Sequence, residues 1–209
     1  NIMMGMNEMI IRETESRDIA EYAKNSALAG KTLENLVNNL LAYSRITSGH
    51  FLPMRIQFSL SGFLENFIAI CKKDCKRNNI DLEYYINPDI PCDVMGDSGL
   101  LSQLLKNILS VATYNNENEY INLSFNWKSS IQKQGTLMVT MEHSRSSLSD
   151  ENIYFLYNKT PIPTDIDRLN GIDFDLTIIK HLLEVLNGSI EVSKIIDNRS
   201  TFKLSIPYE

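Results

Sequence analysis

A stretch near the end of the chain has the spacing of a phosphate-binding turn that leads into a helix and then a strand: NGIDFDLTIIKHLLEVLNGSIEV, residues 170–192. Such a turn uses glycine so that backbone N–H groups can approach phosphate with no Cβ in the way. Gly171 meets this need, but Asp173 and Asp175 stand where further glycines are wanted. A carboxylate about 4 Å from a phosphate oxygen costs roughly 4 kcal/mol at an effective dielectric near 20. The stretch is therefore either a nucleotide site or the remains of one.

The same two carboxylates suit the start of a helix. We expect a helix over residues 174–186, with Asp173 at its N-cap and Asp175 in its first turn. Both positions set negative charge beside free N–H groups and the positive end of the helix dipole. The sequence therefore predicts that the protein's own carboxylates occupy the place of phosphate.

The composition argues against nucleic-acid binding, a cysteine metal site and a membrane span. The net charge of -6 and the lack of a basic, aromatic-rich stripe argue against a nucleic-acid partner. The three cysteines, Cys71, Cys75 and Cys92, lack metal-ligand spacing, so we interpret them as lone buried thiols and expect no metal site. No apolar run approaches the roughly 18 residues of a membrane span. The first residues resemble neither a signal peptide nor a natural start, so we expect a cytoplasmic piece of a longer protein.

Two regions must position these residues. Residues 1–50 are strand-poor, and apolar residues recur at steps of three and four, which predicts an antiparallel helical hairpin. A hairpin cannot bury both sides of such a seam alone, so we expect a homodimer through residues 1–50, although the seam could pack on the rest of the chain. Residues 51–209 alternate helix and strand signals, with helices over 60–77, 97–114 and 150–157 and strands over 80–86, 120–127, 136–142, 189–196 and 200–207, the last two joined as a hairpin through the turn residues 197–199. This order predicts an α+β layer of helices on one sheet.

At this point four motifs in order resemble the catalytic core of sensor histidine kinases over nearly the whole chain. They are LENLVNNLLAYSRITSGHF, IPCDVMGDSGLLSQLLKNILSVA, GIDFDLTIIKHLLEVLNGSIEV and STFKLSIP. The resemblance implies a dimerising helical hairpin, then a two-layer α/β sandwich of the Bergerat, ATPase-like type with a mixed sheet. It also implies a response-regulator receiver domain as partner, and it admits a membrane anchor elsewhere in the protein.

The resemblance locates the phosphoacceptor histidine a few residues before Asn1, outside this chain. His50, His143 and His181 then serve as surface or packing residues, and we expect no catalytic residue among them.

In this family an asparagine on a long helix holds the Mg²⁺ that bridges the ATP phosphates, because hard cations prefer oxygen ligands. Asn107 matches the family's first asparagine, but the metal ligand falls at Val111 and the lysine that usually follows falls at Tyr114. A valine cannot coordinate a hard cation. The resemblance therefore predicts that the Mg²⁺ site has lost a main protein ligand.

The family's first glycine box, D-x-G-x-G-I, aligns with EHSRSS. Glu142 then takes the place of the aspartate that reads adenine, and Ser144 and Ser146 take the places of glycines. A polar loop that binds no ligand is the better interpretation of this segment. The resemblance also assigns Thr177, on the helix after the second box, to the degenerate pocket. Between the boxes we expect a short rigid connection, residues 148–170, in place of a mobile lid.

Three readings follow. The first is a histidine-kinase-like signalling module that cannot bind ATP productively, a pseudokinase, with no cofactor. The second is an active divergent kinase that uses ATP and Mg²⁺ and phosphorylates the histidine upstream of Asn1. The third keeps only an interaction domain built on the same fold.

Overall fold

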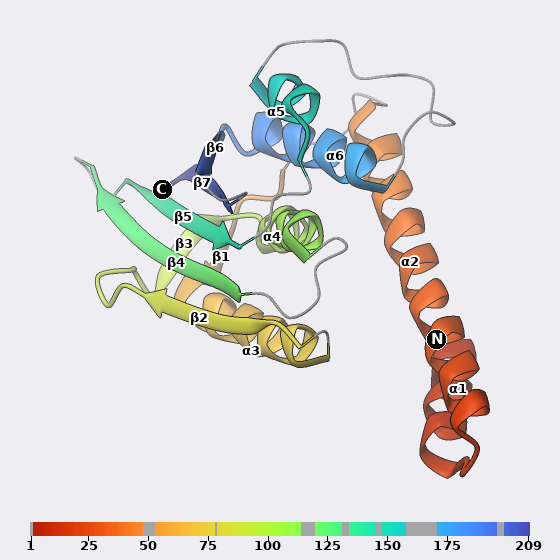
Figure 1. The fold of residues 1–209 in the computed structure, drawn as a ribbon. Helices are drawn as coiled ribbons and strands as arrows, with labels where there is room; N and C mark the ends of the chain where they lie inside the picture. The colour runs from red at the N-terminus through yellow and green to blue at the C-terminus, as the bar shows by residue number, and fades with distance from the viewer. Residues whose placement is uncertain are drawn as a thin grey trace. The chain divides into compact units, whose positions relative to one another are not determined.

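The computed structural model describes residues 2–47, 53–77, 79–113, 120–130, 134–144, 148–157, 171–195 and 199–209. The chain divides into two compact units, Asn1–Phe51 and Leu52–Glu209. Each unit is a fold in its own right, the first all-helical and the second mixed (Figure 1).

The first unit is a helical hairpin of α1 (Ile2–Glu13) and α2 (Arg17–Thr47). Ser16 begins α2 by a hydrogen bond from the Ile19 N–H to its hydroxyl, the pattern of an N-cap. The two helices approach closely where side chains are small. A Cβ on Gly30 would lie 2.8 Å from the Met3 side chain. In the same contact line the Asn7 amide donates to the Ser26 hydroxyl at 3.0 Å, so the hairpin as predicted is formed.

Many large apolar side chains of the hairpin stay open in the single chain. Ile2 is 82% exposed, Met6 62%, Tyr22 71% and Leu33 59%, whereas Ala23 is buried. The internal contact of the two helices therefore covers only part of the apolar seam. Exposed apolar strips of this kind mark surfaces that bind other proteins, membranes or ligands.

The second unit is a sandwich of helices on a five-stranded sheet. Its helices are α3 (Leu60–Arg77), α4 (Ser98–Thr113), α5 (Asp150–Tyr157) and α6 (Gly171–Val185), and its sheet strands are β2 (Asp81–Ile86), β4 (Tyr120–Ser129), β5 (Gly135–His143), β6 (Ser189–Ile195) and β7 (Arg199–Tyr208). The strand order is β2-β4-β5-β7-β6. β2 pairs with β4 in parallel and the other pairs are antiparallel. The predicted α+β class with a mixed sheet is confirmed.

A second, two-stranded sheet was not predicted. β1 (Ile56–Ser59) pairs antiparallel with β3 (Asp93–Gly96), with Phe58 opposite Val94. Each strand has only four residues, too few to show an alternating pattern in the sequence. The Met95 N–H donates to the Glu209 carbonyl at 3.0 Å, which joins this small sheet to the end of β7.

The core lies between one face of the large sheet and the helices (Figure 1). Alternate residues of β4 and β5 are buried, and Phe125 on β4 meets Phe67 of α3 with ring centroids 6.4 Å apart. The other face carries half-exposed polar side chains such as Ser124 and Thr140. Strand alternation therefore decides, residue by residue, which side chains face the helical layer.

The cysteines are free thiols. Cys71 and Cys75 are buried on α3 as expected, but Cys92 is exposed, so the prediction was wrong for that residue. Burial, aided by the nearby Cys75, raises the pKa of Cys71 to about 12, and burial also raises the pKa of Cys75. Thiols held in the protonated form are poor nucleophiles and poor metal ligands.

Candidate functional site

The helix that carries the predicted magnesium position is fixed at its start by Asp97. Its Oδ1 accepts hydrogen bonds from the N–H groups of Gly99 and Leu100, at 3.0 and 3.1 Å. Asp97 is thus the N-cap of α4, which satisfies donors that the helix leaves free. Apolar residues such as Leu101 and Leu104 are fully buried on the same helix and hold it in the core.

α4 packs against α6, and one polar contact joins them. The Ser110 hydroxyl of α4 donates to Oδ2 of Asp175 on α6 at 2.8 Å, in partly buried surroundings. A hydrogen bond to a charged acceptor is stronger than one between neutral groups. Asp175, one of the two carboxylates predicted to occupy the place of phosphate, is therefore hydrogen-bonded to a side chain of α4.

Asn107 and Val111 lie on the same side of α4 as Ser110, since residues three and four apart share a helix face. Val111 is fully buried and offers no oxygen ligand. Asn107 is 7% exposed, and its Nδ2 has no hydrogen-bond partner among the residues that the structure describes. Tyr114 lies outside the described residues. Among the described residues, Asn107 is thus the one predicted position on this face of α4 with a polar side chain, and that side chain is buried.

The start of α6 differs from the prediction. The helix begins at Gly171 and not at residue 174, so Asp173 is its third residue and cannot be the N-cap. Asp175 is the fifth residue, just past the first turn. The earlier start has a local reason, because the sequence IDFDLTII after Gly171 contains no helix breaker. A glycine in the helix interior would cost free energy, but Gly171 is the first residue of the helix. The side chain of Asp173 lies outside what the structure describes.

Thr177, the last residue assigned to the predicted pocket, lies on α6 as well. It follows Asp175 by two residues, which turns it about 200° around the helix axis, away from the α4 side. Thr177 is fully buried there. The assignment of Thr177 to the degenerate pocket therefore stays a prediction from the family resemblance.

The predicted first glycine box is also placed differently. On β5 the buried side chains are those of the odd-numbered residues from Gly135 to His143, and Glu142 is only half-buried. Because successive side chains of a strand point to opposite faces, Glu142 lies on the polar face of the sheet, away from the helices. This orientation argues against Glu142 as the adenine-reading carboxylate in this layer.

His143 takes the inward place that Glu142 was expected to take. It is 1% exposed and stacks on Phe202 of β7, with ring centroids 5.6 Å apart. Leu148, five residues on, is buried as well. The signal was present in the sequence, because the apolar alternation through residues 137, 139 and 141 continues to 143 and not to 142.

Ser144 has a structural role at the end of β5. Its N–H donates to the Tyr120 carbonyl at 3.3 Å, and its hydroxyl accepts from the Tyr120 N–H at 3.2 Å. These bonds extend the pairing of β4 and β5 by one residue. Ser146, the other predicted glycine position, lies outside the described residues.

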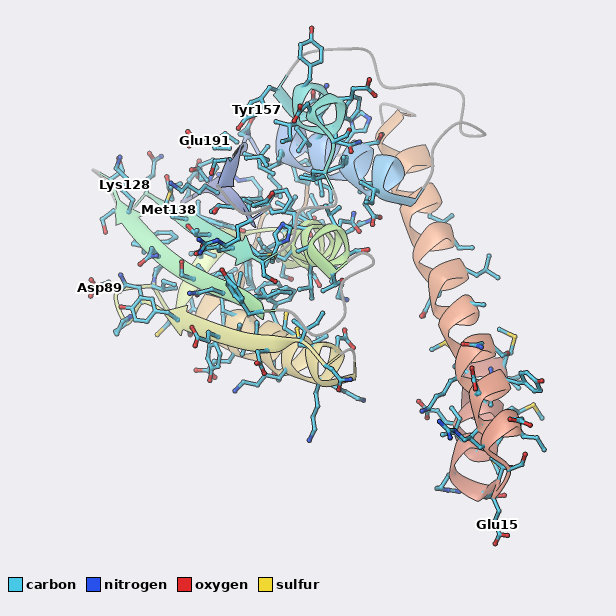
Figure 2. The ribbon with its side chains drawn as sticks, viewed as in Figure 1. Glu15, Asp89, Lys128, Met138, Tyr157 and Glu191 are labelled. Atoms are coloured by element: carbon cyan, nitrogen blue, oxygen red, sulfur yellow. The ribbon has the colours of Figure 1, made fainter. Side chains whose placement is uncertain are left out.

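Between the two boxes the predicted short helix is present as α5. Its last residue, Tyr157 (Figure 2), donates its hydroxyl to the Val192 carbonyl at 2.9 Å and accepts from the Val192 N–H. Lys180 of α6 donates to the Phe155 carbonyl at 3.3 Å and lies 4.6 Å from the centre of the Phe155 ring. Burial lowers the pKa of Lys180. α5 is therefore fixed on β6 and α6; residues 158–170 of the expected connection lie outside the described part of the chain.

The remaining histidines and the metal prediction complete the site. His181 on α6 has a 12% exposed side chain, and its Nδ1 lies 3.5 Å from the Glu184 carboxylate. Burial lowers the pKa of His181, and Glu184 partly offsets this. His50 lies outside the described residues. Within the described ranges, no three or more His, Cys, Asp or Glu side chains gather as a metal site would need, and no helix is both long and apolar enough to span a membrane.

Known proteins similar to this chain are histidine kinases. Hybrid signal transduction histidine kinase B of Dictyostelium discoideum is 26% identical over 212 aligned residues, which cover 99% of this chain and 11% of that protein. Peroxide stress-activated histidine kinase mak3 of Schizosaccharomyces pombe is 28% identical over 206 residues, covering 92% of this chain and 8% of that protein. The chain thus spans only a small fraction of these relatives. No protein-family model matches it.

Solved structures agree on the fold. Histidine kinase AdeS of Acinetobacter baumannii superposes with a TM-score of 0.62 at 15% identity, covering 98% of this chain and 92% of that chain. Histidine kinase ThkA, in complex with the response regulator protein TrrA, gives 0.61 at 16% identity, covering 100% of this chain and 57% of that chain. The chain has the fold of a histidine kinase catalytic core, as the sequence motifs indicated.

Proposed function

We propose that the chain is a histidine-kinase-like signal-transduction module whose sandwich does not bind ATP productively, a pseudokinase without a cofactor. Similarity to histidine kinases along the chain supports the signalling module. The observation that carries the loss of nucleotide binding is the hydrogen bond from Ser110 to Asp175. It ties a carboxylate between α4 and α6, where the family resemblance locates the phosphates.

Two further observations support the same proposal. Val111 replaces the expected magnesium ligand with a buried apolar side chain, so a triphosphate would lack its bridging cation. Glu142 faces the other side of the sheet, so it does not supply the carboxylate for adenine. Three features therefore oppose the binding of ATP: charge repulsion acts on its phosphates, the missing ligand at position 111 acts on its magnesium, and the missing carboxylate acts on its adenine.

Direct binding tests the proposal. The 209-residue chain is titrated with ATP in the presence of Mg²⁺ by calorimetry, and its thermal unfolding is measured with and without the nucleotide. A ligand at 100 times its dissociation constant adds about 2.7 kcal/mol to the unfolding free energy. We expect neither heat nor a thermal shift. A dissociation constant tighter than about 100 μM, or roughly -5.5 kcal/mol, would refute the proposal.

If the natural sequence does not bind ATP, a variant that restores the family's residues shows whether these residues are the cause. The triple variant Val111→Asn/Asp173→Gly/Asp175→Gly restores the family's residues at these positions. We expect it to bind Mg²⁺-ATP measurably more tightly than the natural sequence, because the metal ligand returns and two like charges leave. Equal absence of binding in both proteins would show that these residues do not account for the loss.

One observation favours the second candidate, an active divergent kinase that uses ATP and Mg²⁺. The Asn107 side chain is buried, and its amide nitrogen has no partner among the described residues, so it is available to a ligand. Autophosphorylation by a longer protein that carries the histidine upstream of Asn1 would support this candidate over the pseudokinase.

The same proposal includes two protein partners. The first is a second copy of the chain, bound through residues 1–50, because the apolar strip around Leu33 and Tyr22 stays exposed in one chain. The second is a response-regulator receiver domain, a kind of partner that the ThkA complex supports. Light scattering tests the dimer: Tyr22→Lys/Leu33→Lys is expected to elute as a monomer at a concentration where the natural sequence is dimeric.

A further inference from the structure

One carboxylate joins two parts of the sandwich unit that are distant in sequence. Asp97 is 8% exposed, and its Oδ1 caps α4 through Gly99 and Leu100. Its other oxygen, Oδ2, accepts the Met54 N–H at 3.0 Å. Met54 lies near the start of this unit, next to the segment by which the chain arrives from the helical hairpin. Asp97 therefore fastens the leading segment of the sandwich, residues 53–55, to the start of α4.

A second donor lies close to the same carboxylate. Tyr208 is 6% exposed, and its hydroxyl is a buried group with no hydrogen-bond partner in the described part of the chain. Its ring lies against the residue before Asp97, since a Cβ on Gly96 would fall 2.7 Å from the ring. Met54, Asp97 and Tyr208 also line one cavity of about 510 Å³. Burial, and then the Asp97 charge, raise the pKa of Tyr208, so the phenol stays a neutral donor.

A buried hydroxyl without a partner is a cost that a small movement of Asp97 could remove. The hydrogen bond of the Met54 N–H, by contrast, is only partly buried and belongs to a residue that is 62% exposed, so water can take the place of the carboxylate. If Oδ2 moves from Met54 to Tyr208, the Met54 N–H loses its bond to Asp97 and can bond to water instead. The buried Tyr208 hydroxyl gains an acceptor that water does not supply. For both positions to be populated, the two arrangements must lie close in free energy.

We propose that Asp97 is a two-position latch on the leading segment: in one position Oδ2 holds the Met54 N–H, and in the other it accepts the Tyr208 hydroxyl and releases Met54. Oδ1 keeps the cap of α4 in both positions. The ion pair between Arg55 and Glu209 lies beside the latch and keeps residue 55 near the end of β7 when Met54 is released. The latch does not depend on whether the sandwich binds nucleotide.

Hydrogen exchange of the Met54 amide, measured by NMR on the 209-residue chain, tests the latch. In Asp97→Asn the side-chain oxygen can still cap α4, but the amide nitrogen in place of Oδ2 cannot accept. We expect Met54 to exchange roughly five- to tenfold faster while Gly99 and Leu100 stay protected. In Tyr208→Phe the competing donor is gone, so we expect Met54 to exchange several-fold more slowly than in the natural sequence.

Two controls separate the latch from general loosening. Asp93→Asn changes an exposed carboxylate of the neighbouring strand β3 and is expected to leave Met54 exchange unchanged. The buried β5 amide of Val139 reports global stability and should exchange alike in all variants. Unchanged Met54 exchange in Asp97→Asn, or exchange in Tyr208→Phe as fast as in the natural sequence, would overturn the proposal. If Asp97→Asn does not fold, Tyr208→Phe alone decides, because it removes only an unpartnered hydroxyl.

Discussion

From the hydrogen bond between Ser110 and Asp175 we predict the coupling energy of the two side chains. A hydrogen bond to a charged group contributes about 1.5–3 kcal/mol to stability, and this one is only partly buried, which favours the lower end. We therefore expect a coupling energy of about 1.5 kcal/mol in a double-mutant cycle of Ser110→Ala, Asp175→Ala and the double variant. The cycle cancels what each substitution does alone, including the loss of negative charge near the start of α6.

Urea unfolding followed by tryptophan fluorescence measures this cycle cleanly. The protein has one tryptophan, Trp127 on β4, so the signal reports the sandwich and not the helical hairpin. Ser102→Ala on the same helix is the matched control, since a helical Ser→Ala change by itself gains up to about 0.5 kcal/mol in propensity. A coupling energy within about 0.3 kcal/mol of zero would show that Asp175 is not tied to α4. The main support for the proposal that Asp175 occupies the position of the ATP phosphates would then be lost.

Three other perturbations have defined outcomes. Gly135→Ala sets a Cβ 2.1 Å from the Trp127 ring, so we expect a loss of about 1–3 kcal/mol in unfolding free energy and a shifted Trp127 emission. Tyr157→Phe removes both bonds to the edge strand β6 and should lower the unfolding free energy by about 1–2 kcal/mol in the same urea assay. The lowered pKa of His181 means that the unfolded chain takes up its proton first, so this contribution to stability is present above about pH 6.5 and is lost as the pH falls. His181→Gln should therefore flatten the decline in urea midpoint between about pH 7 and pH 5, and an unchanged slope would contradict this.

Long periodic segments were predictable because their signal lies in the local sequence. The helices of 60–77 and 150–157 were predicted to their ends, since apolar spacing and the flanking polar residues mark them. The strands of the large sheet were predicted by alternation, and the closing hairpin of β6 and β7 by its turn residues. The small sheet of β1 and β3 was missed, because each strand is held by a partner more than thirty residues away and not by its own pattern.

The site was predicted less well, for a reason visible on β5. A motif alignment fixes which residues are near each other along the chain, but a shift of one residue sends a side chain to the other face of a strand. Glu142 was assigned by chemical likeness to an aspartate, whereas the pleat directs His143 inward. Burial alternation would have been the better guide.

The sequence by itself determined the fold family, the helical hairpin and the presence of a valine at position 111, because these depend on residue type and periodicity along the chain. Only the tertiary structure decided that Asp175 bonds to Ser110 and that Asp97 reaches Met54. Each of these depends on the relative position of elements far apart in sequence. That position is set by packing of the whole core, which no local pattern encodes.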